Sequence, residues 1–217
     1  MKNEMVLCIE TSLLSEKLSG CGFVPIDTDK MLDVLAPENL WLISRARIEE
    51  NEDFRQVIPY VILTYGNDIV IYSRTSEGGE ARLHDKISLG LGGHVNLFDA
   101  ANALASSAAI SELVTCAPDG EIIVDKAMSR ELIEEVGFTR NMRNIRNECF
   151  LGFIFDGSDA VSRSHLGVVW RIELRERIEL HSCSDIKDCQ YVPIEQLIQY
   201  DSQMENWSRL CLDFLGT

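Results

Sequence analysis

The pattern of apolar and polar positions divides the chain into short strands and helices. Strands are expected where apolar runs are bounded by turn residues, at 5–9, 57–65, 69–74, 149–155, 166–174 and near Tyr191. Helices are expected at 15–18, 28–35, 126–136, 194–200 and 205–215. Neither an internal repeat nor a linker interrupts this pattern. We therefore expect one domain over 1–217, with 1–55 as an accessory N-terminal layer and 56–217 as the core.

The middle of the chain carries strong turn and backbone signals. Gly66-Asn-Asp68 separates two strands and predicts a hairpin. Pro59 lacks a backbone N–H, which favours a place at a sheet edge or at the beginning of its strand. The run Ile87-Ser-Leu-Gly-Leu-Gly-Gly-His-Val95 is too rich in glycine to favour a strong strand. Its glycines predict a close approach of the backbone to another group.

An alanine- and serine-rich segment at 100–118 favours a helix packed closely against a neighbour. Pro118-Asp-Gly120 is expected to end it, because proline and glycine both disfavour the helix interior. A second helix is then expected over 126–136, closed by Gly137. The alanine-rich segment should therefore form a helical element separate from the helix that follows.

Composition narrows the class of protein. Hydrophobic residues make up 46% of the 217 residues, enough for a packed core, and the formal net charge is -15. Such a charge disfavours binding to nucleic acids and anionic membranes, and the one basic run, 140–146, is short and surrounded by acidic sequence. The seven cysteines form no Cys-x-x-Cys pair, and neither a signal peptide nor a membrane span is evident. We expect reduced thiols and a cytoplasmic location.

The helix at 126–136 places three carboxylates beside its buried face. At 100° per residue, Leu132 and Val136 fall about 40° and about 80° from Met128 and form the core-facing stripe. The three glutamates share an arc of about 100° next to this stripe, nearest first: Glu135, Glu131 and Glu134. Like charges at this spacing repel one another, and a bound cation would remove the repulsion. Oxygen ligands of this kind suit magnesium or manganese better than zinc.

A simpler interpretation remains open from the helix alone. Arg130 and Glu134 stand four residues apart and can form an ordinary ion pair. The other acids would then belong to a solvated face of an acidic protein. The two interpretations differ in whether the glutamates hold a metal ion.

The wider pattern resembles a known family. Residues 130–138, Arg-Glu-Leu-Ile-Glu-Glu-Val-Gly-Phe, resemble the second half of the Nudix box at every specified position. Gly93 matches the glycine of the first half, and Asp99 stands where the family has glutamate. The spacer that follows is much longer than in the family, so 100–122 resembles an insertion inside the box. Asp99 has an alternative role as N-cap of the alanine-rich helix.

Other stretches strengthen the resemblance. They are similar to a bacterial Nudix subgroup with a Gly-Gly-His-Val signature, described as predicted phosphoesterases, and comprise Gln56–Tyr60, Arg82–Asn96, His165–Trp170 and Glu205–Ser208. The resemblance implies an α/β (α+β) fold, the Nudix-like α/β/α sandwich with a mixed sheet. It also implies metal-dependent hydrolysis of a phosphoanhydride bond in a nucleoside diphosphate linked to another group.

The resemblance further implies roles for individual residues. Glu131, Glu134 and Glu135 would be ligands of Mg²⁺ or Mn²⁺, Gly93 could offer its backbone carbonyl, and Arg130 would orient a glutamate. The general base would be Glu131 or an acid of the loop 176–188, where the candidates are Glu179, Asp185 and Asp188. His94 could contact a phosphate or make a structural hydrogen bond, whereas His165 favours a structural role.

Two further functions remain as alternatives. One is a catalytically silent Nudix domain that binds a nucleotide, which the intact glutamate set disfavours. The other is an isopentenyl-diphosphate isomerase-like enzyme, which would need a cysteine where this chain has His94-Val-Asn96. The expected partner is a small nucleotide-type substrate, with no nucleic acid and no membrane, and a homodimer is compatible with the sequence.

Overall fold

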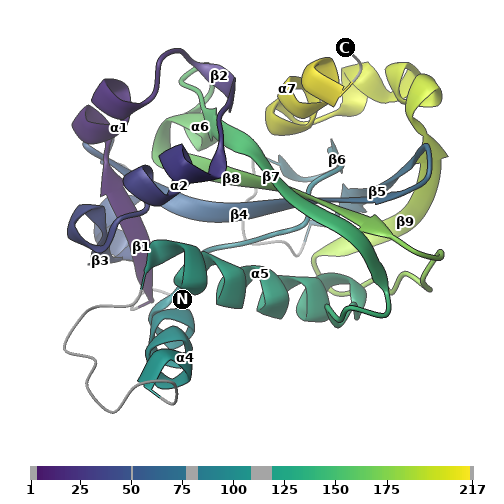
Figure 1. Cartoon of the computed structure of the whole chain (residues 1–217). Coiled ribbons are helices and arrows are strands. Elements are labelled where there is room, and N and C mark those ends of the chain that lie inside the picture. Colours follow the sequence, from purple (N-terminus) through teal and green to yellow (C-terminus); the bar gives the residue numbers. More distant parts are fainter. Residues whose placement is uncertain (1–3, 50, 77–82, 109–118, 216–217) are drawn as a thin grey trace. The chain divides into compact units, whose positions relative to one another are not determined.

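The structure is a computed structural model that describes residues 4–49, 51–76, 83–108 and 119–215 (Figure 1). Its first elements are β1 (Met5–Glu10), α1 (Thr11–Lys17), β2 (Gly22–Pro25), α2 (Thr28–Val34), η1 (Pro37–Asn39), β3 (Trp41–Ser44), α3 (Arg45–Ile48), β4 (Phe54–Tyr65) and β5 (Asp68–Arg74). There follow β6 (Ile87–Ser88), α4 (Leu97–Ala108), α5 (Gly120–Val136), β7 (Ile145–Phe155), α6 (Ala160–Ser164), β8 (His165–Leu174), β9 (Ile186–Pro193), η3 (Ile194–Gln203) and α7 (Asn206–Leu215).

The chain forms two compact units, each assembled from three separate stretches. The first comprises Met1–Pro59, Gly93–Met128 and Gly152–Val168. The second comprises Tyr60–Gly92, Ser129–Leu151 and Val169–Thr217. The expectation of one domain with an accessory layer at 1–55 stays a prediction.

In the first unit, strands near the N-terminus take part in the main sheet. β1 pairs antiparallel with β3 and with the beginning of β4, and β2 pairs antiparallel with the end of β7 (Figure 1). The strand order is β2-β7-β8-β4-β1-β3. The sequence pattern did not predict β2 or β3, because each is a segment of four residues without a clear alternation.

The position of Pro59 corrects one expectation. β4 lies inside the strand order, between β8 and β1, and Pro59 falls in the middle of its twelve residues. Residues 54–56 carry the pairing with β1, and Val61 exchanges backbone hydrogen bonds of 2.8 and 2.9 Å with Leu91. Pro59 lies between these two ladders, where its missing N–H removes none of their hydrogen bonds.

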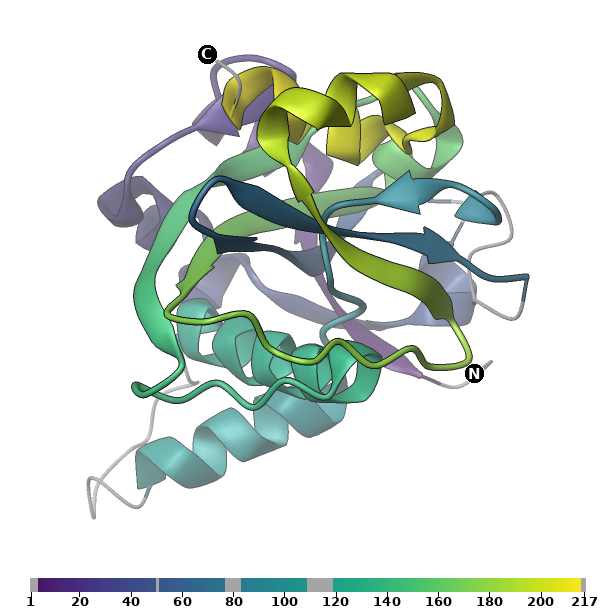
Figure 2. The ribbon, with the colours of Figure 1, turned by 90° about the vertical axis from the view of Figure 1, so that its right-hand side faces the viewer.

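The second unit is organised around β5. β5 forms the expected hairpin with β4 through the turn at Gly66, which has a φ of 57°, and it also pairs with β6 and β9. β5 and β9 lie side by side in Figure 2. The chain then continues through η3 into α7. The segment after β9 was predicted as a helix over 194–200, and it forms a longer helix, of the 3₁₀ type, over Ile194–Gln203.

The bounds of the two helices α4 and α5 also differ from expectation. The alanine-rich helix, α4, begins at Leu97 and is described to Ala108, while 109–118 lie outside the described residues. α5 begins at Gly120, earlier than predicted, because the carbonyl of Asp119 accepts the first N–H groups of the helix, from Ile122 and Ile123. α4 and α5 are separate helices, as expected, but 120–122 belong to α5.

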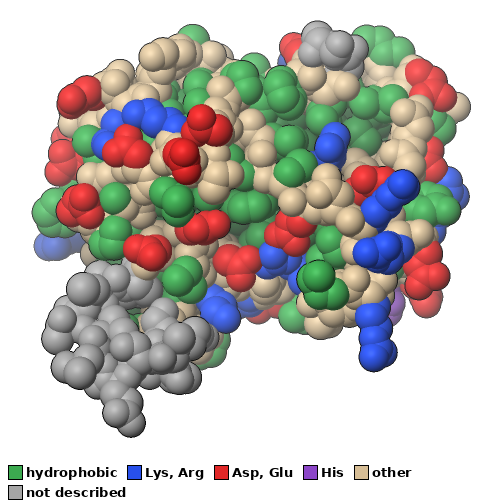
Figure 3. All heavy atoms as spheres, viewed as in Figure 1, with side chains coloured by type: hydrophobic (Ala, Val, Ile, Leu, Met, Phe, Trp, Pro, Cys, Tyr) green, Lys and Arg blue, Asp and Glu red, His purple; other side chains and the backbone are tan. Residues whose placement is uncertain are grey.

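The surface agrees with the acidic composition of the chain. Acidic side chains are spread over the face shown in Figure 3. Two arginines of the basic run form ion pairs, Arg140 with Glu148 and Arg146 with Glu173, and the expectation that this run binds no nucleic acid stays a prediction. Within the described ranges, no helix is long and apolar enough to cross a membrane. The six cysteines that the structure describes are free thiols.

Candidate active site

α5 buries the face that the sequence predicted. Met128, Leu132 and Val136, the expected stripe, are each at most 1% exposed. The three glutamates follow the predicted order of exposure: Glu135 is 8% exposed as a whole residue, and the side chains of Glu131 and Glu134 are 14% and 58% exposed. The amphipathic pattern therefore placed the three carboxylates correctly relative to the core.

Gly137 ends α5 as expected. Its φ of 70° is left-handed, a conformation that glycine adopts without strain. The N–H of Gly137 donates to the carbonyl of Ile133 at 3.0 Å, which is the bond of the αL motif, and the N–H of Phe138 donates to the carbonyl of Leu132, also at 3.0 Å. This termination fixes the last turn of the helix, which carries Glu135.

Arg130 holds two of the glutamates. Its Nη1 lies 2.6 Å from Oε1 of Glu131 and 3.1 Å from Oε2 of Glu134. The ordinary ion pair between Arg130 and Glu134 is therefore present, but Arg130 shares its charge with Glu131. The contacts match the orienting role that the resemblance implies for Arg130.

Glu135 is the most strongly perturbed acid of the site. Its Oε2 accepts a hydrogen bond of 2.9 Å from the backbone N–H of Gly92. Burial raises the pKa of Glu135 to about 8; Arg74 and the Gly92 N–H oppose this rise, and the charges of Glu131 and Asp185 add to it. A buried carboxylate beside a like charge is thus held in a state that a cation would stabilise.

This pKa predicts how stability depends on pH. The pKa of Glu135 is about 8 in the folded protein, above the value of roughly 4.3 for an unfolded chain. The folded state therefore binds the proton more tightly, and this contribution to stability is present at about pH 4 and lost as pH rises through about 8.

We expect the metal-free protein to become less stable between about pH 5 and about pH 8 relative to a Glu135→Gln variant. Thermal unfolding of both proteins in EDTA across this range measures the difference. Parallel stability curves for the two proteins would contradict the expected burial of a charge at position 135.

The carboxylates do not form a closed metal cage. Over the described ranges, no three side chains of His, Cys, Asp or Glu are gathered as they would be around an ion. The contacts explain why: Arg130 engages Glu131 and Glu134, and Glu135 faces the Gly92 N–H. The donor chemistry nevertheless fits a hard divalent cation, because all three side chains offer carboxylate oxygens, and burial makes the charged form of Glu135 costly unless a cation is present.

Asp99 takes part in a helix cap. Asn96 Oδ1 accepts the N–H groups of Phe98 and Asp99, at 2.9 and 3.2 Å, and Asp99 Oδ2 accepts the N–H of Asn96 at 3.0 Å. The N-cap of α4 is therefore Asn96, and Asp99 is its reciprocal partner in a capping box. This favours a structural role for Asp99, which is 1% exposed, and its role in substrate binding stays a prediction. So does the role of the Gly93 carbonyl.

His94 and His165 face each other through their Nε2 atoms, 3.2 Å apart. His165 Nδ1 lies 2.8 Å from the carbonyl of Val161 and must donate, because a carbonyl only accepts. In its neutral form, His165 therefore accepts at Nε2, and His94 donates. The predicted structural role of His165 fits this geometry and its exposure of 4%.

The loop before β9 brings one of the candidate bases near Glu135. The carbonyl of Asp185 accepts the N–H of Thr75 at 2.9 Å, which ties the loop to the end of β5. The charge of Asp185 contributes to the raised pKa of Glu135, after burial and Glu131. Asp188 instead lies within β9 and has a φ of 56°.

Sequence reasoning missed Arg74, which acts on Glu135, and the partner of Arg74, Glu205. Arg74, at the end of β5, lowers the pKa of Glu135 against the larger effect of burial. Glu205, which directly precedes α7, pairs with Arg74 at 3.4 Å. The run Glu205–Ser208 had been noted only as part of the resemblance. Because 131 positions separate Arg74 from Glu205 along the chain, no local pattern could have paired them.

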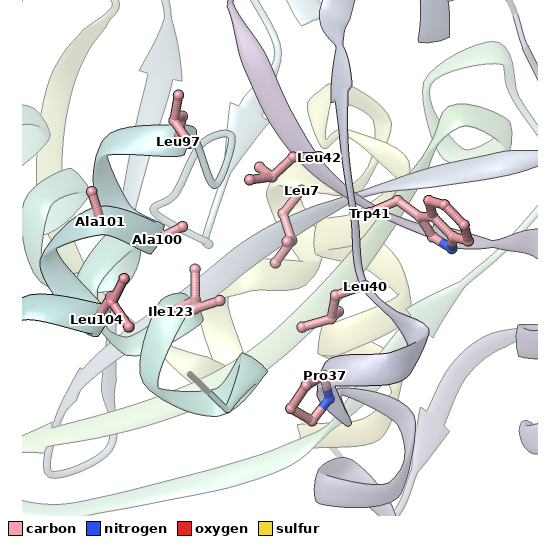
Figure 4. A pocket seen from close by; sticks show the side chains of 10 residues that line it. All are labelled: Leu7, Pro37, Leu40, Trp41, Leu42, Leu97, Ala100, Ala101, Leu104 and Ile123. Carbon is pink, nitrogen blue, oxygen red and sulfur yellow. The ribbon is translucent and has the colours of Figure 1, made fainter. Parts of the chain in front are cut away.

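An apolar pocket in the first unit does not fit the expected chemistry. It has a volume of about 360 Å³, and all ten side chains that line it are aliphatic, proline or tryptophan (Figure 4). None of these ten side chains is charged, so they could not neutralise the charge of phosphate oxygens. We therefore place the candidate active site at α5.

Comparisons with known proteins bear on the family and the fold of the chain. No protein-family model matches the chain. The protein YmaB of Bacillus subtilis (strain 168) is 31% identical over 175 residues, which cover 79% of this chain and 76% of YmaB. The crystal structure of Tm1382, described as a candidate Nudix hydrolase, has a TM-score of 0.75 and 25% identity over 98% of both chains. The expected α+β fold with a mixed sheet is confirmed.

Proposed function

This chain belongs to the Nudix hydrolase superfamily, and we propose that it cleaves a phosphoanhydride bond in a nucleoside-diphosphate-linked substrate with the help of a divalent cation. The observation that carries the proposal is Glu135. It is a buried carboxylate with a raised pKa, hydrogen-bonded to Gly92 and placed on one helix face with two other glutamates. Such a perturbed acid, placed beside a glycine-rich backbone segment, is typical of a catalytic site.

The proposed ligands of the cation are Glu131, Glu134 and Glu135. Their carboxylate oxygens favour Mg²⁺ or Mn²⁺. When bound, a divalent cation offsets the charge of phosphate oxygens and lowers the pKa of water. Arg130 would orient Glu131 and Glu134, with which it already pairs.

The proposed proton acceptor is the carboxylate of Asp185. It lies in a loop tied to β5, and its charge acts on Glu135. Glu131 is the alternative base, but its Oε1 accepts from Arg130 at 2.6 Å. A carboxylate outside this ion pair is better placed to take a proton from water.

An Asp185→Asn variant should hydrolyse substrate roughly 10²-fold more slowly, because the amide cannot accept the proton. Its affinity for Mn²⁺ should change little. Steady-state rates and a Mn²⁺ titration of the same preparation separate the two effects. An unchanged rate would exclude Asp185 as the base and leave Glu131.

The proposed function is tested with a panel of nucleotide sugars, dinucleotides, nucleoside triphosphates and isopentenyl diphosphate. Each is incubated with Mg²⁺ or Mn²⁺, and released phosphate is detected after phosphatase coupling. We expect hydrolysis of at least one nucleoside-diphosphate compound and none in EDTA. Isomerisation of isopentenyl diphosphate would favour the isomerase-like alternative, and binding without turnover would favour the silent domain. A homodimer remains a proposal that sedimentation can test.

A further inference from the structure

Arg74 is a largely buried cation beside the proposed metal site. Its side chain is 19% exposed, its Nε lies 3.4 Å from Oε2 of Glu205, and its Cζ lies 5.5 Å from the centre of the Tyr72 ring. Among the described residues, no other side chain forms a hydrogen bond or ion pair with this guanidinium. The position of Arg74 therefore depends mainly on Glu205.

Glu205 is held firmly by its own neighbours. Its Oε1 accepts from the hydroxyls of Ser88 at 2.6 Å, Tyr60 at 3.0 Å and Ser208 at 3.3 Å. Its backbone N–H donates to the carbonyl of Ile87 at 3.0 Å. Because both ends of Glu205 are fixed and it is 5% exposed, its Oε2 is a stationary anion for Arg74.

Arg74 also lies within the field of a second buried carboxylate, that of Glu135. The ring of Tyr72 lies against the guanidinium of Arg74, and the hydroxyl of Tyr72 donates to the carbonyl of Gly90 at 2.6 Å. Two residues later, the N–H of Gly92 donates to Glu135. Burial lowers the pKa of Arg74, but the electrostatic interactions with Tyr72, Glu205 and Glu135 outweigh it and hold the pKa above its usual value.

We propose that Glu205 is a positioning residue of the metal site, which keeps Arg74 from pairing with Glu135 and so leaves the Glu135 carboxylate open to a divalent cation. The proposal rests on the proposed function. It gives the run Glu205–Ser208 a role in metal binding, although no residue of this run is a proposed ligand.

The consequence of removing the charge follows from burial. In a Glu205→Gln variant, Arg74 becomes a buried cation without its anion, which is strongly unfavourable. Glu135 is the next carboxylate whose charge acts on Arg74. An arginine paired with Glu135 would compete with the metal ion for the same oxygens. Loss of such an outer partner typically weakens metal binding about 10- to 100-fold.

The test is a titration of the full chain with Mn²⁺ alone, following free Mn²⁺ by electron paramagnetic resonance. The variants are Glu205→Gln, Arg74→Met, the double variant and Glu148→Gln. The last is the matched control, because it breaks a comparable ion pair, with Arg140, in the same unit. We expect about 10-fold or greater weakening for Glu205→Gln, and no change for Glu148→Gln.

The double variant separates positioning from simple structural damage. Without the guanidinium at position 74, Glu205→Gln should cause no further loss of affinity, and Arg74→Met alone should bind Mn²⁺ at least as tightly as the natural protein. A loss that persists in the Arg74→Met background, or no loss in Glu205→Gln, would overturn the proposal. If Glu205→Gln does not fold, weaker binding by Arg74→Met would overturn it.

The same titration distinguishes this inference from the proposed function. Failure of the natural protein to bind Mn²⁺, or equal binding by Glu135→Gln, would remove the metal site itself, and the positioning role would fall with it. Normal binding by the natural protein with unchanged binding by Glu205→Gln would remove only the role of Glu205.

Discussion

Replacing Glu135 with glutamine is expected to lower hydrolysis roughly 10³-fold, because a lost metal ligand removes about 4 kcal/mol of transition-state stabilisation. The substitution preserves the shape of the side chain and removes its charge. The rate is measured with whichever compound of the substrate panel is turned over fastest, at saturating Mg²⁺.

The stability of this variant should move in the opposite direction. Without metal, Glu135→Gln should be as stable as the natural protein or more stable, because it removes a carboxyl group whose charged form is disfavoured by burial and by the charge of Glu131. Saturating Mg²⁺ should stabilise the natural protein by mass action and the variant much less.

The matched control is Glu121→Gln, which makes the same chemical change in the first turn of the same helix. It should leave both the rate and the metal-induced stabilisation unchanged. A solvated acidic face would behave differently, since all the glutamate variants would then stay within about 0.5 kcal/mol of the natural protein. Equal rates for Glu135→Gln and the natural protein would contradict the assigned ligand.

The second large effect is expected for Gly90→Ala. An added Cβ would lie 2.0, 2.1 and 2.4 Å from ring atoms Cζ, Cε1 and Cδ1 of Tyr60. The ring cannot move aside, because its hydroxyl is hydrogen-bonded to Glu205 at 3.0 Å and Ser208 at 2.9 Å. Trp207 packs against it at 5.6 Å between ring centres. We expect the free energy of unfolding to fall by about 3 kcal/mol, measured by urea denaturation.

A double-mutant cycle isolates the cause. In a Tyr60→Leu background the added methyl group meets no aromatic ring, so Gly90→Ala should cost much less. The same cost in both backgrounds would show that Gly90 matters for its backbone and not for the ring. The glycines of the run 87–95 predicted a close approach of the backbone to another group. At Gly90 that group is the buried side chain of Tyr60.

The chemistry-bearing helix was the most predictable part of the chain. A period of 3.6 residues orders the exposure of Glu135, Glu131 and Glu134 whatever the helix packs against, because the buried stripe fixes the orientation of the helix. Gly137 likewise ended the helix for a local reason, its left-handed conformation. Local patterns of this kind need no knowledge of the rest of the fold.

Features that depend on distant partners could not be predicted. Gly120 reads as a helix breaker, yet it starts α5, and its N–H donates to the carbonyl of Leu35 at 3.2 Å. Pro59 is tolerated inside β4 because the ladders around it leave a gap. The pairing of Arg74 with Glu205 exists only once β5 and the start of α7 have come together. Each of these depends on contacts between segments far apart in the sequence.

The central claim, that the glutamates of α5 hold the catalytic cation, is tested most directly by diffraction from crystals soaked in Mn²⁺. Anomalous differences locate manganese without any assumption about the substrate. We predict a peak within coordination distance of the carboxylates of Glu131 and Glu135, at roughly 2.0–2.2 Å as expected for oxygen ligands of a small hard cation. Well-measured data with no peak at these glutamates, or with peaks only elsewhere on the acidic surface, would contradict the account.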